Sequence, residues 1–158
     1  MAEHGDLTRA EYYDRVRSQI EHEDELINLR VVWQLLVQSF FFSTFATLLN
    51  AKDPAKNALI DQLQHFLVWV VPIAAFLAGL LTFVGIVTAL LNVNSLRRSY
   101  EDYSRDTDGR DQSSKLFPPI QGPDHLRKLA QISPIGLPLL FILTWLIILI
   151  RLVAGAWD

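Results

Sequence analysis

Three long blocks of apolar residues, separated by polar segments, restrict this chain to very few folds. The blocks cover residues 31–50, 66–91 and 135–156, and the only charged residue within them is Arg151. A helix of roughly 20 residues crosses the hydrocarbon core of a bilayer, which is about 30 Å thick. Lipid offers no hydrogen-bond partners, so only helices and closed barrels can span it. Because the blocks are continuously apolar and do not alternate, we predict an all-α protein with three transmembrane helices.

The polar segments divide the rest of the chain into three parts. Residues 1–30 are polar and mostly acidic, unlike a secretory signal, so we expect a cytoplasmic helix that leads into a retained anchor. Neither Pro nor Gly interrupts residues 8–50, which favours one continuous helix. Residues 51–65 are expected to form an outer loop and the start of the second helix. Residues 92–134 are expected to form a cytoplasmic extension of that helix, a polar connection and a short helix that Pro134 ends.

The distribution of basic residues predicts the orientation of the spans. Cytoplasmic segments of membrane proteins carry an excess of Lys and Arg. With three spans, residues 1–30 and 92–134 share one side of the membrane, and they hold eleven of the 14 Lys and Arg residues: Arg9, Arg15, Arg17, Arg30, Arg97, Arg98, Arg105, Arg110, Lys115, Arg127 and Lys128. The other side holds only Lys52, Lys56 and Arg151. We therefore predict a cytoplasmic N-terminus and a C-terminus on the opposite side.

One face of the first helix carries polar residues into the membrane. At 100° per residue, a single stripe contains Arg30, Gln34, Gln38, Phe41 and Phe45. Amide side chains that face lipid are costly, so these amides must meet water or protein. Two interpretations remain open. The stripe lines the pore of a ring of subunits, with a phenylalanine gate, or its amides hydrogen-bond to a neighbouring helix.

Small and hydroxyl-bearing residues indicate close helix packing. The face of the first helix opposite the stripe carries Ser39, Ser43, Thr47 and Asn50, and we expect its hydroxyl groups to mark a packed helix contact. The second span has small residues four positions apart in three pairs: Ala75 with Gly79, Ala78 with Thr82, and Gly85 with Ala89. This spacing lets helices approach closely in membranes.

An acidic cluster precedes the first span. Glu21, Asp24 and Glu25 fall on one helix face. Three interpretations apply: ion pairs with Arg97 or Arg98 at a matching depth, a cation vestibule at a pore mouth, or a divalent-metal site with oxygen ligands. We expect ion pairs and assign no metal site.

The sequence also argues against several functions. The chain contains no cysteine, and its net charge of −3 gives no reason to expect nucleic acid as a partner. It has neither a zinc-protease motif nor a glycine-rich phosphate loop, and no acids are paired within the spans. We therefore expect a protein that is not an enzyme, with no catalytic residue and no cofactor.

Two stretches of the chain resemble a group of small, uncharacterised bacterial inner-membrane proteins. The first is the sequence EHEDELINLR, residues 21–30, before the first span. The second begins with FPPIQG, residues 117–122, and continues with His125, Pro134, Pro138, Phe141 and Trp145. The resemblance implies a location in the bacterial inner (plasma) membrane, where the orientation predicted above would put the C-terminus of this multi-pass chain in the periplasm. It implies no activity.

A single subunit offers few partners for Gln34 and Gln38, so the sequence favours self-assembly. The leading functional hypothesis is a homo-oligomeric ion channel or pore. The alternative is a non-catalytic accessory or scaffold subunit of a larger membrane complex. The expected partners are the lipid bilayer and further copies of this chain.

Overall fold

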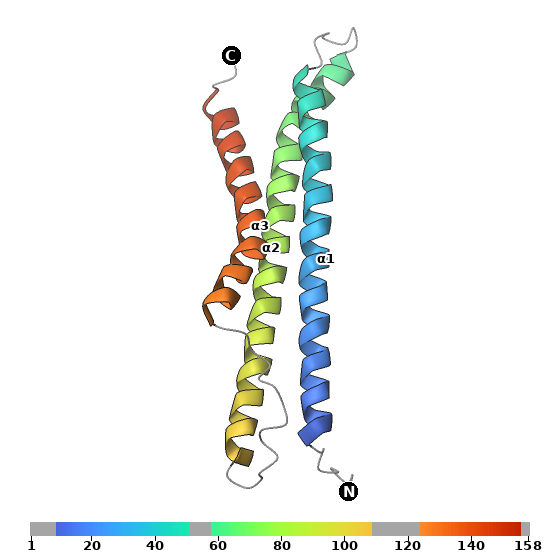
Figure 1. Ribbon diagram of the computed structural model, residues 1–158. Coiled ribbons are helices and arrows are strands. Elements are labelled where there is room, and N and C mark those ends of the chain that lie inside the picture. The colour runs from blue at the N-terminus through green and yellow to red at the C-terminus, as the bar shows by residue number, and fades with distance from the viewer. Residues whose placement is uncertain (1–8, 51–57, 109–123, 156–158) are drawn as a thin grey trace, which may run out of the picture.

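The described residues form three long helices, each of which contains one of the predicted spans. A computed structural model describes residues 9–50, 58–108 and 124–155. Helix α1 spans Arg9–Asn50, α2 spans Ala58–Asp108 and α3 spans Asp124–Val153. Figure 1 shows α1 and α2 lying antiparallel along their whole length, with α3 packed beside the upper half of α2. The expected fold class, all-α with three long apolar helices that extend beyond their spans, is confirmed.

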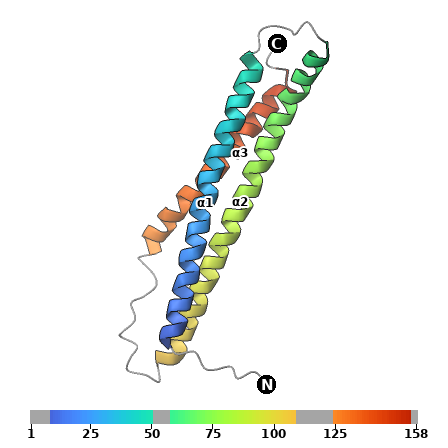
Figure 2. The same cartoon turned by 90° about the vertical axis from the view of Figure 1, so that its right-hand side faces the viewer.

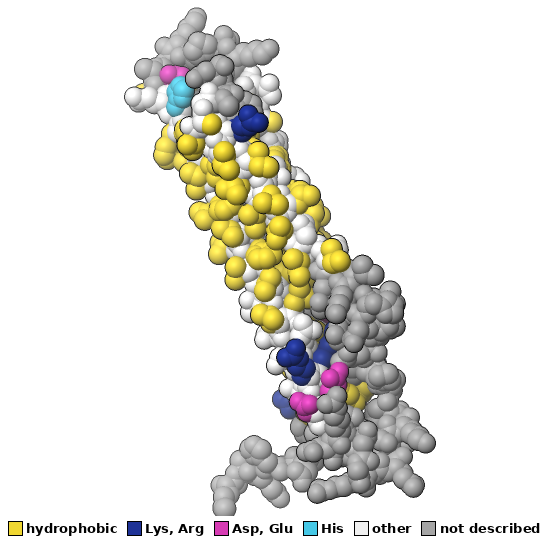
Figure 3. All heavy atoms as spheres, turned by 90° about the vertical axis from the view of Figure 1, so that its left-hand side faces the viewer, with side chains coloured by type: hydrophobic (Ala, Val, Ile, Leu, Met, Phe, Trp, Pro, Cys, Tyr) yellow, Lys and Arg dark blue, Asp and Glu magenta, His cyan; other side chains and the backbone are white. Residues whose placement is uncertain are grey.

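The length and composition of the helices identify a multi-pass membrane protein. Each contains a segment long and apolar enough to cross a bilayer, within Ala10–Asn50, Leu59–Asp102 and Ile132–Val153. Figure 3 shows a broad band of apolar side chains around the middle of the molecule, with charged side chains gathered at the two ends. This pattern is inverted relative to a soluble protein, because the bilayer core is the solvent for the middle band.

Beyond the band, α1 and α2 continue as a two-helix stalk, which we define as residues 10–27 and 89–102. Its interior is an apolar cluster of buried side chains: Tyr13, Val16, Ile20, Val93 and Tyr100. The rings of Tyr13 and Tyr100 meet edge to face, with centroids 5.8 Å apart, and Tyr12 stacks on Tyr100. Unlike the spans, the stalk has a sharp contrast between a buried apolar seam and an exposed polar surface. The hydrophobic effect therefore stabilises the pairing of the two helices there.

The third helix differs from the prediction. Pro134 was expected to end a short helix before the third span, but α3 runs without interruption through Pro134 and Pro138. Proline inside a helix removes one backbone hydrogen bond and can bend the helix without ending it. Figure 2 shows the first turns of α3 leading away from α1 and α2. The predicted polar connection at residues 109–123 and the outer loop at 51–57 lie outside the described residues.

Two further clusters bury helix contacts, one where the stalk meets the band and one within the band. Ile27, Ile86 and Ala89 form one, against which Ile135 of α3 packs. Phe45, Val71, Ala75 and Trp145 form the other, and it joins all three helices. Of the six small residues at four-residue spacing, Ala75, Gly79 and Ala89 are buried, and Ala78, Thr82 and Gly85 are half-buried. Small side chains here let neighbouring backbones approach closely, which maximises van der Waals contact in lipid.

Candidate functional site

A hydrogen-bonded network at the centre of the band connects all three helices. The Gln38 amide nitrogen donates to the backbone carbonyl oxygen of Ala75 at 3.0 Å. The indole nitrogen of Trp145 donates to the Gln38 amide oxygen at 2.6 Å. Gln38 and Trp145 are both completely buried. One side chain of α1 thus holds α2 through a carbonyl group and α3 through an indole, in a medium that offers no competing water.

Gln34 lies one turn below Gln38 on the same face, in different surroundings. Its side chain is also buried, but its amide nitrogen has no hydrogen-bond partner among the residues that the structure describes. Gly79 of α2 faces both glutamines. A Cβ atom added at Gly79 would lie 3.6 Å from each amide nitrogen and 3.1 Å from Cγ1 of Ile142. Glycine at this position therefore provides the room for two amides and an isoleucine.

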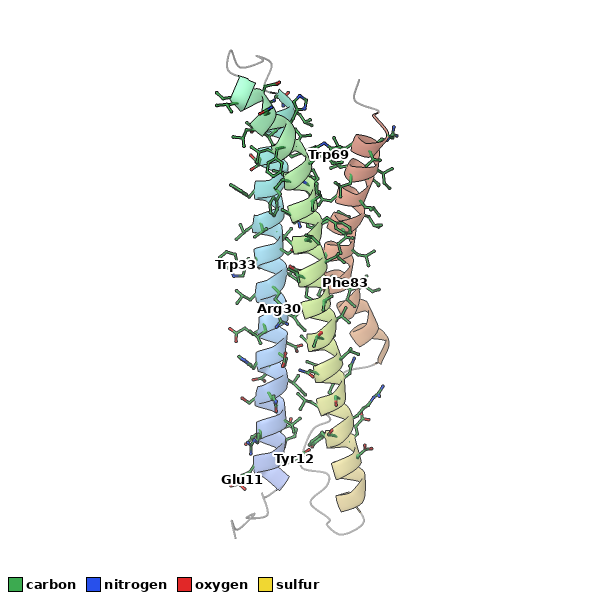
Figure 4. All side chains as sticks on the ribbon, turned by 180° about the vertical axis from the view of Figure 1, so that it is seen from behind. Glu11, Tyr12, Arg30, Trp33, Trp69 and Phe83 are labelled. Atoms are coloured by element: carbon green, nitrogen blue, oxygen red, sulfur yellow. The ribbon has the colours of Figure 1, made fainter. Side chains whose placement is uncertain are left out.

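Arg30 occupies the end of the stripe nearest the stalk. Its Nη1 donates to the carbonyl oxygen of Gly85 at 3.0 Å, and the side chain is half-buried. Figure 4 shows Arg30 lying between α1 and α2, whereas Trp33, one turn along, projects away from the bundle. A Cβ atom at Gly85 would lie 3.7 Å from both Cδ and Nε of Arg30, so the guanidinium lies directly over this glycine.

The phenylalanines of the stripe belong to an aromatic cluster around Trp145. Phe45 is buried and meets the indole edge to face, with centroids 5.7 Å apart, while Phe41 packs against the edge of the same cluster. Phe42, which is not in the stripe, stacks on the indole, with ring centroids 4.5 Å apart. The two rings hold the indole in the orientation that donates to Gln38. Trp145 is therefore a member of the site that the stripe on α1 alone did not identify.

The stripe faces the interior of one chain. Gln34, Gln38 and Phe45 are each at most 5% exposed, and their neighbours come from α2 and α3 of the same molecule. For Gln38, this arrangement matches the second interpretation of the stripe, hydrogen bonding to neighbouring helices, whereas the Gln34 amide nitrogen has no described partner. The arrangement does not match the first, because side chains enclosed by their own three helices cannot also line an axis between subunits. Contrary to expectation, a single subunit does supply partners for Gln38, whose amide nitrogen and oxygen are both hydrogen-bonded within the chain.

The hydroxyl face of α1 also differs from expectation. Ser39, Ser43 and Thr47 are exposed, so within this chain they form no packed helix contact. Ser39 donates to the carbonyl oxygen of Leu35, and Thr47 donates to that of Ser43. Hydroxyl groups bonded to the preceding turn of their own helix can face lipid at little cost. The hydroxyl groups of Ser39 and Thr47 therefore need no second helix.

The acidic cluster does not reach Arg97 or Arg98. Glu21 instead pairs with Arg17, whose Nε lies 2.9 Å from the carboxylate, and this hydrogen bond raises the pKa of the exposed Arg17 guanidinium. Asp24 and Glu25 have no ion-pair partner among the described side chains. The predicted ion pairs are therefore not formed within the chain, and pairing between chains stays a prediction.

The register of α1 and α2 explains this failure. Ile20 and Val93 lie in one buried cluster. Asp24 is one turn from Ile20 toward the spans, whereas Arg97 is one turn from Val93 in the opposite direction. The two charges are thus separated by about two turns, or roughly 11 Å along the stalk. Within the described part of the chain, no group of three or more acidic or histidine side chains is placed to hold a metal ion.

The chain was also compared with known proteins. No family model, no curated protein and no solved structure matches it.

Proposed function

We propose that this protein is a non-catalytic accessory or scaffold subunit, in which three membrane-spanning helices hold a two-helix stalk outside the bilayer. One observation carries this proposal: Gln38 connects α1 to α2 and to α3, so the polar side chains of the spans are used to fix the helices to one another. Buried polar side chains in spans commonly line ion or substrate pathways. Here the nitrogen and the oxygen of the central amide are both hydrogen-bonded within the chain, which favours a structural role.

The stalk is the part of the molecule best suited to contact a partner. Its apolar seam is closed between α1 and α2, and its outer surface carries exposed charged side chains, including Asp14, Arg15, Asp24 and Glu25. A rigid helical pair with a charged exterior can recognise a protein by complementary charge and shape. The excess of basic residues in the two segments on this side supports a stalk in the cytoplasm. The resemblance to bacterial inner-membrane proteins supports that location.

The competing function is a homo-oligomeric ion channel. It would now require a pore built from surfaces other than the stripe, since Arg30, Gln34, Gln38, Phe41 and Phe45 pack within one chain. Self-association itself remains compatible with the scaffold proposal, because the outward faces of all three spans are free to meet lipid or another copy.

Two measurements on the purified full chain separate these functions. The first is the mass of the detergent-solubilised particle, and the second is conductance in a planar bilayer. We expect a monomer or dimer that conducts no ions, and we expect replacement of Phe41 and Phe45 by Ser to leave conductance at background. A ring of four or more chains with measurable single-channel currents would overturn the scaffold proposal in favour of the channel, and currents raised further by the double replacement would return the stripe to the pore.

A further inference from the structure

An open groove of about 410 Å³ lies between α1 and α2 at the level where the first span begins. Its walls are mainly apolar, formed by Leu26 and Leu29 of α1 and Leu81 of α2. Arg30 and Trp33 also line it, and Gly85 forms part of its floor. The groove therefore combines a long apolar surface with one cation.

Arg30 lacks a counter-charge in this groove. Its described interaction is the single hydrogen bond from Nη1 to the carbonyl oxygen of Gly85, and no acidic side chain pairs with it among the described residues. A guanidinium has five N–H donors, so four remain available. The bond to Gly85 fixes the orientation of the group. A half-buried, oriented cation with free donors beside apolar side chains is a site for an anion.

On α1, the groove lies where the charged segment ends and the uncharged block begins. Arg30 immediately precedes the uncharged block at residues 31–50, and Trp33 is 59% exposed one turn into that block. Arginine and tryptophan side chains gather at the level of the lipid headgroups. A phospholipid places its phosphate at this depth and its acyl chains alongside the span, in the direction of Leu81.

We propose that this groove binds one phospholipid, with Arg30 holding the headgroup phosphate and the leucines and Trp33 holding the upper part of an acyl chain. Arginine suits this role because its planar fork can donate two parallel hydrogen bonds to phosphate oxygens. The Thr82 hydroxyl already donates to the carbonyl oxygen of Ala78 at 3.0 Å, so recognition of the phosphate falls to Arg30. This inference goes beyond the proposed function and holds whether the protein acts as a scaffold or a channel.

Native mass spectrometry of the full chain in detergent tests the proposal. The probes are phosphatidylglycerol, phosphatidylethanolamine and diacylglycerol of the same acyl composition. Both phospholipids should bind about tenfold or more tightly than diacylglycerol, because a hydrogen bond to a charged group contributes roughly 1.5–3 kcal/mol. Diacylglycerol binding as tightly as phosphatidylglycerol would overturn phosphate recognition. This comparison uses the parent protein, so it does not depend on a variant that folds.

Variants then locate the site. Replacing Arg30→Gln should weaken phosphatidylglycerol binding about tenfold. The matched control Arg151→Gln removes an exposed arginine outside the groove and should leave binding unchanged. Equal binding by Arg30→Gln and the parent would show that the lipid sits elsewhere. A final arm adds inorganic phosphate at millimolar concentration: it should not displace the lipid, and displacement would identify free phosphate as the ligand and overturn the phospholipid proposal.

Discussion

Gln34 and Gln38 carry the same side chain one helical turn apart, yet they differ in how their amides are satisfied. Gln38 donates to Ala75 and accepts from Trp145, whereas the Gln34 nitrogen is buried without a described partner. A buried, unpaired amide loses its hydration and gains nothing in return. Adjacent members of one stripe should therefore contribute to stability with different magnitudes, and even with opposite signs.

The first prediction compares leucine replacements at these two positions. Gln38→Leu removes both bonds and should lower the free energy of unfolding in micelles by about 0.6–2 kcal/mol. Gln34→Leu should be neutral or stabilising, because it removes an unpaired polar group at similar volume. Reversible unfolding in mixed detergent, followed by circular dichroism, measures both, with Ser39→Ala on the exposed face as control. A loss at Gln34→Leu equal to that at Gln38→Leu would contradict this account.

The second prediction concerns the space that Gly79 leaves. A valine there would place its Cβ 3.1 Å from Ile142 and its branches among the two amides, which forces α2 and α3 apart. Gly79→Val should therefore destabilise the protein by about 1–3 kcal/mol in the same unfolding assay. The control is Gly136→Val, because a Cβ at Gly136 meets no atom within 4 Å. Similar losses from both valines would mean that backbone effects, and not the close approach, set the result.

At the scale of elements, the sequence predicted the helices better than their contacts. The apolar blocks located the spans, the lack of Pro and Gly predicted a continuous α1, and the helical period identified the face of α1 that carries Gln38. The helical period locates a face but does not say which neighbour covers it, so Trp145 of α3 could not be assigned as the partner. In α2, the uncharged residues continue beyond the level of Arg30 on α1. Aligning the predicted ends of the two spans therefore placed Arg97 beside the wrong residues of α1. The prediction that Pro134 ends a helix was wrong. A helix packed against its neighbours can continue through a proline with a bend that an isolated helix would not tolerate.

The third prediction tests the stalk as an element. Tyr100 is buried against Tyr12 and Tyr13, and its ring contacts and apolar burial stabilise the end of the stalk farthest from the spans. Because the chain has no native cysteine, the replacements Ser18→Cys and Arg98→Cys, both at exposed positions, provide the only two thiols for spin labels. Pulsed electron paramagnetic resonance should give one narrow distribution of the distance between the two labels. Replacing Tyr100→Ala should broaden that distribution. The control Ser99→Ala alters an exposed neighbour, and broadening there as well would contradict the assignment.

At the scale of the whole molecule, the three helices form one membrane unit with a stalk on one side. The orientation of this unit rests on the eleven basic residues that share the stalk side. The fourth prediction follows from that distribution. A reporter active only in the periplasm should give signal when fused after Asp158 and none when fused after Asp111. The opposite result would place the stalk in the periplasm. Any partner of the stalk would then have to be periplasmic and not cytoplasmic.

The most direct test of the central claim is the water accessibility of Gln38 in the assembled protein. A single cysteine at Gln38 is treated with a charged, water-soluble thiol reagent in the native membrane, and Ser18→Cys on the exposed surface of the stalk serves as the positive control. Enclosure between α2 and α3 predicts that the cysteine at position 38 reacts only after denaturation, while the one at position 18 reacts at once. Rapid modification of both in the native protein would show that water reaches the stripe, which would contradict the sealed interior and restore the pore.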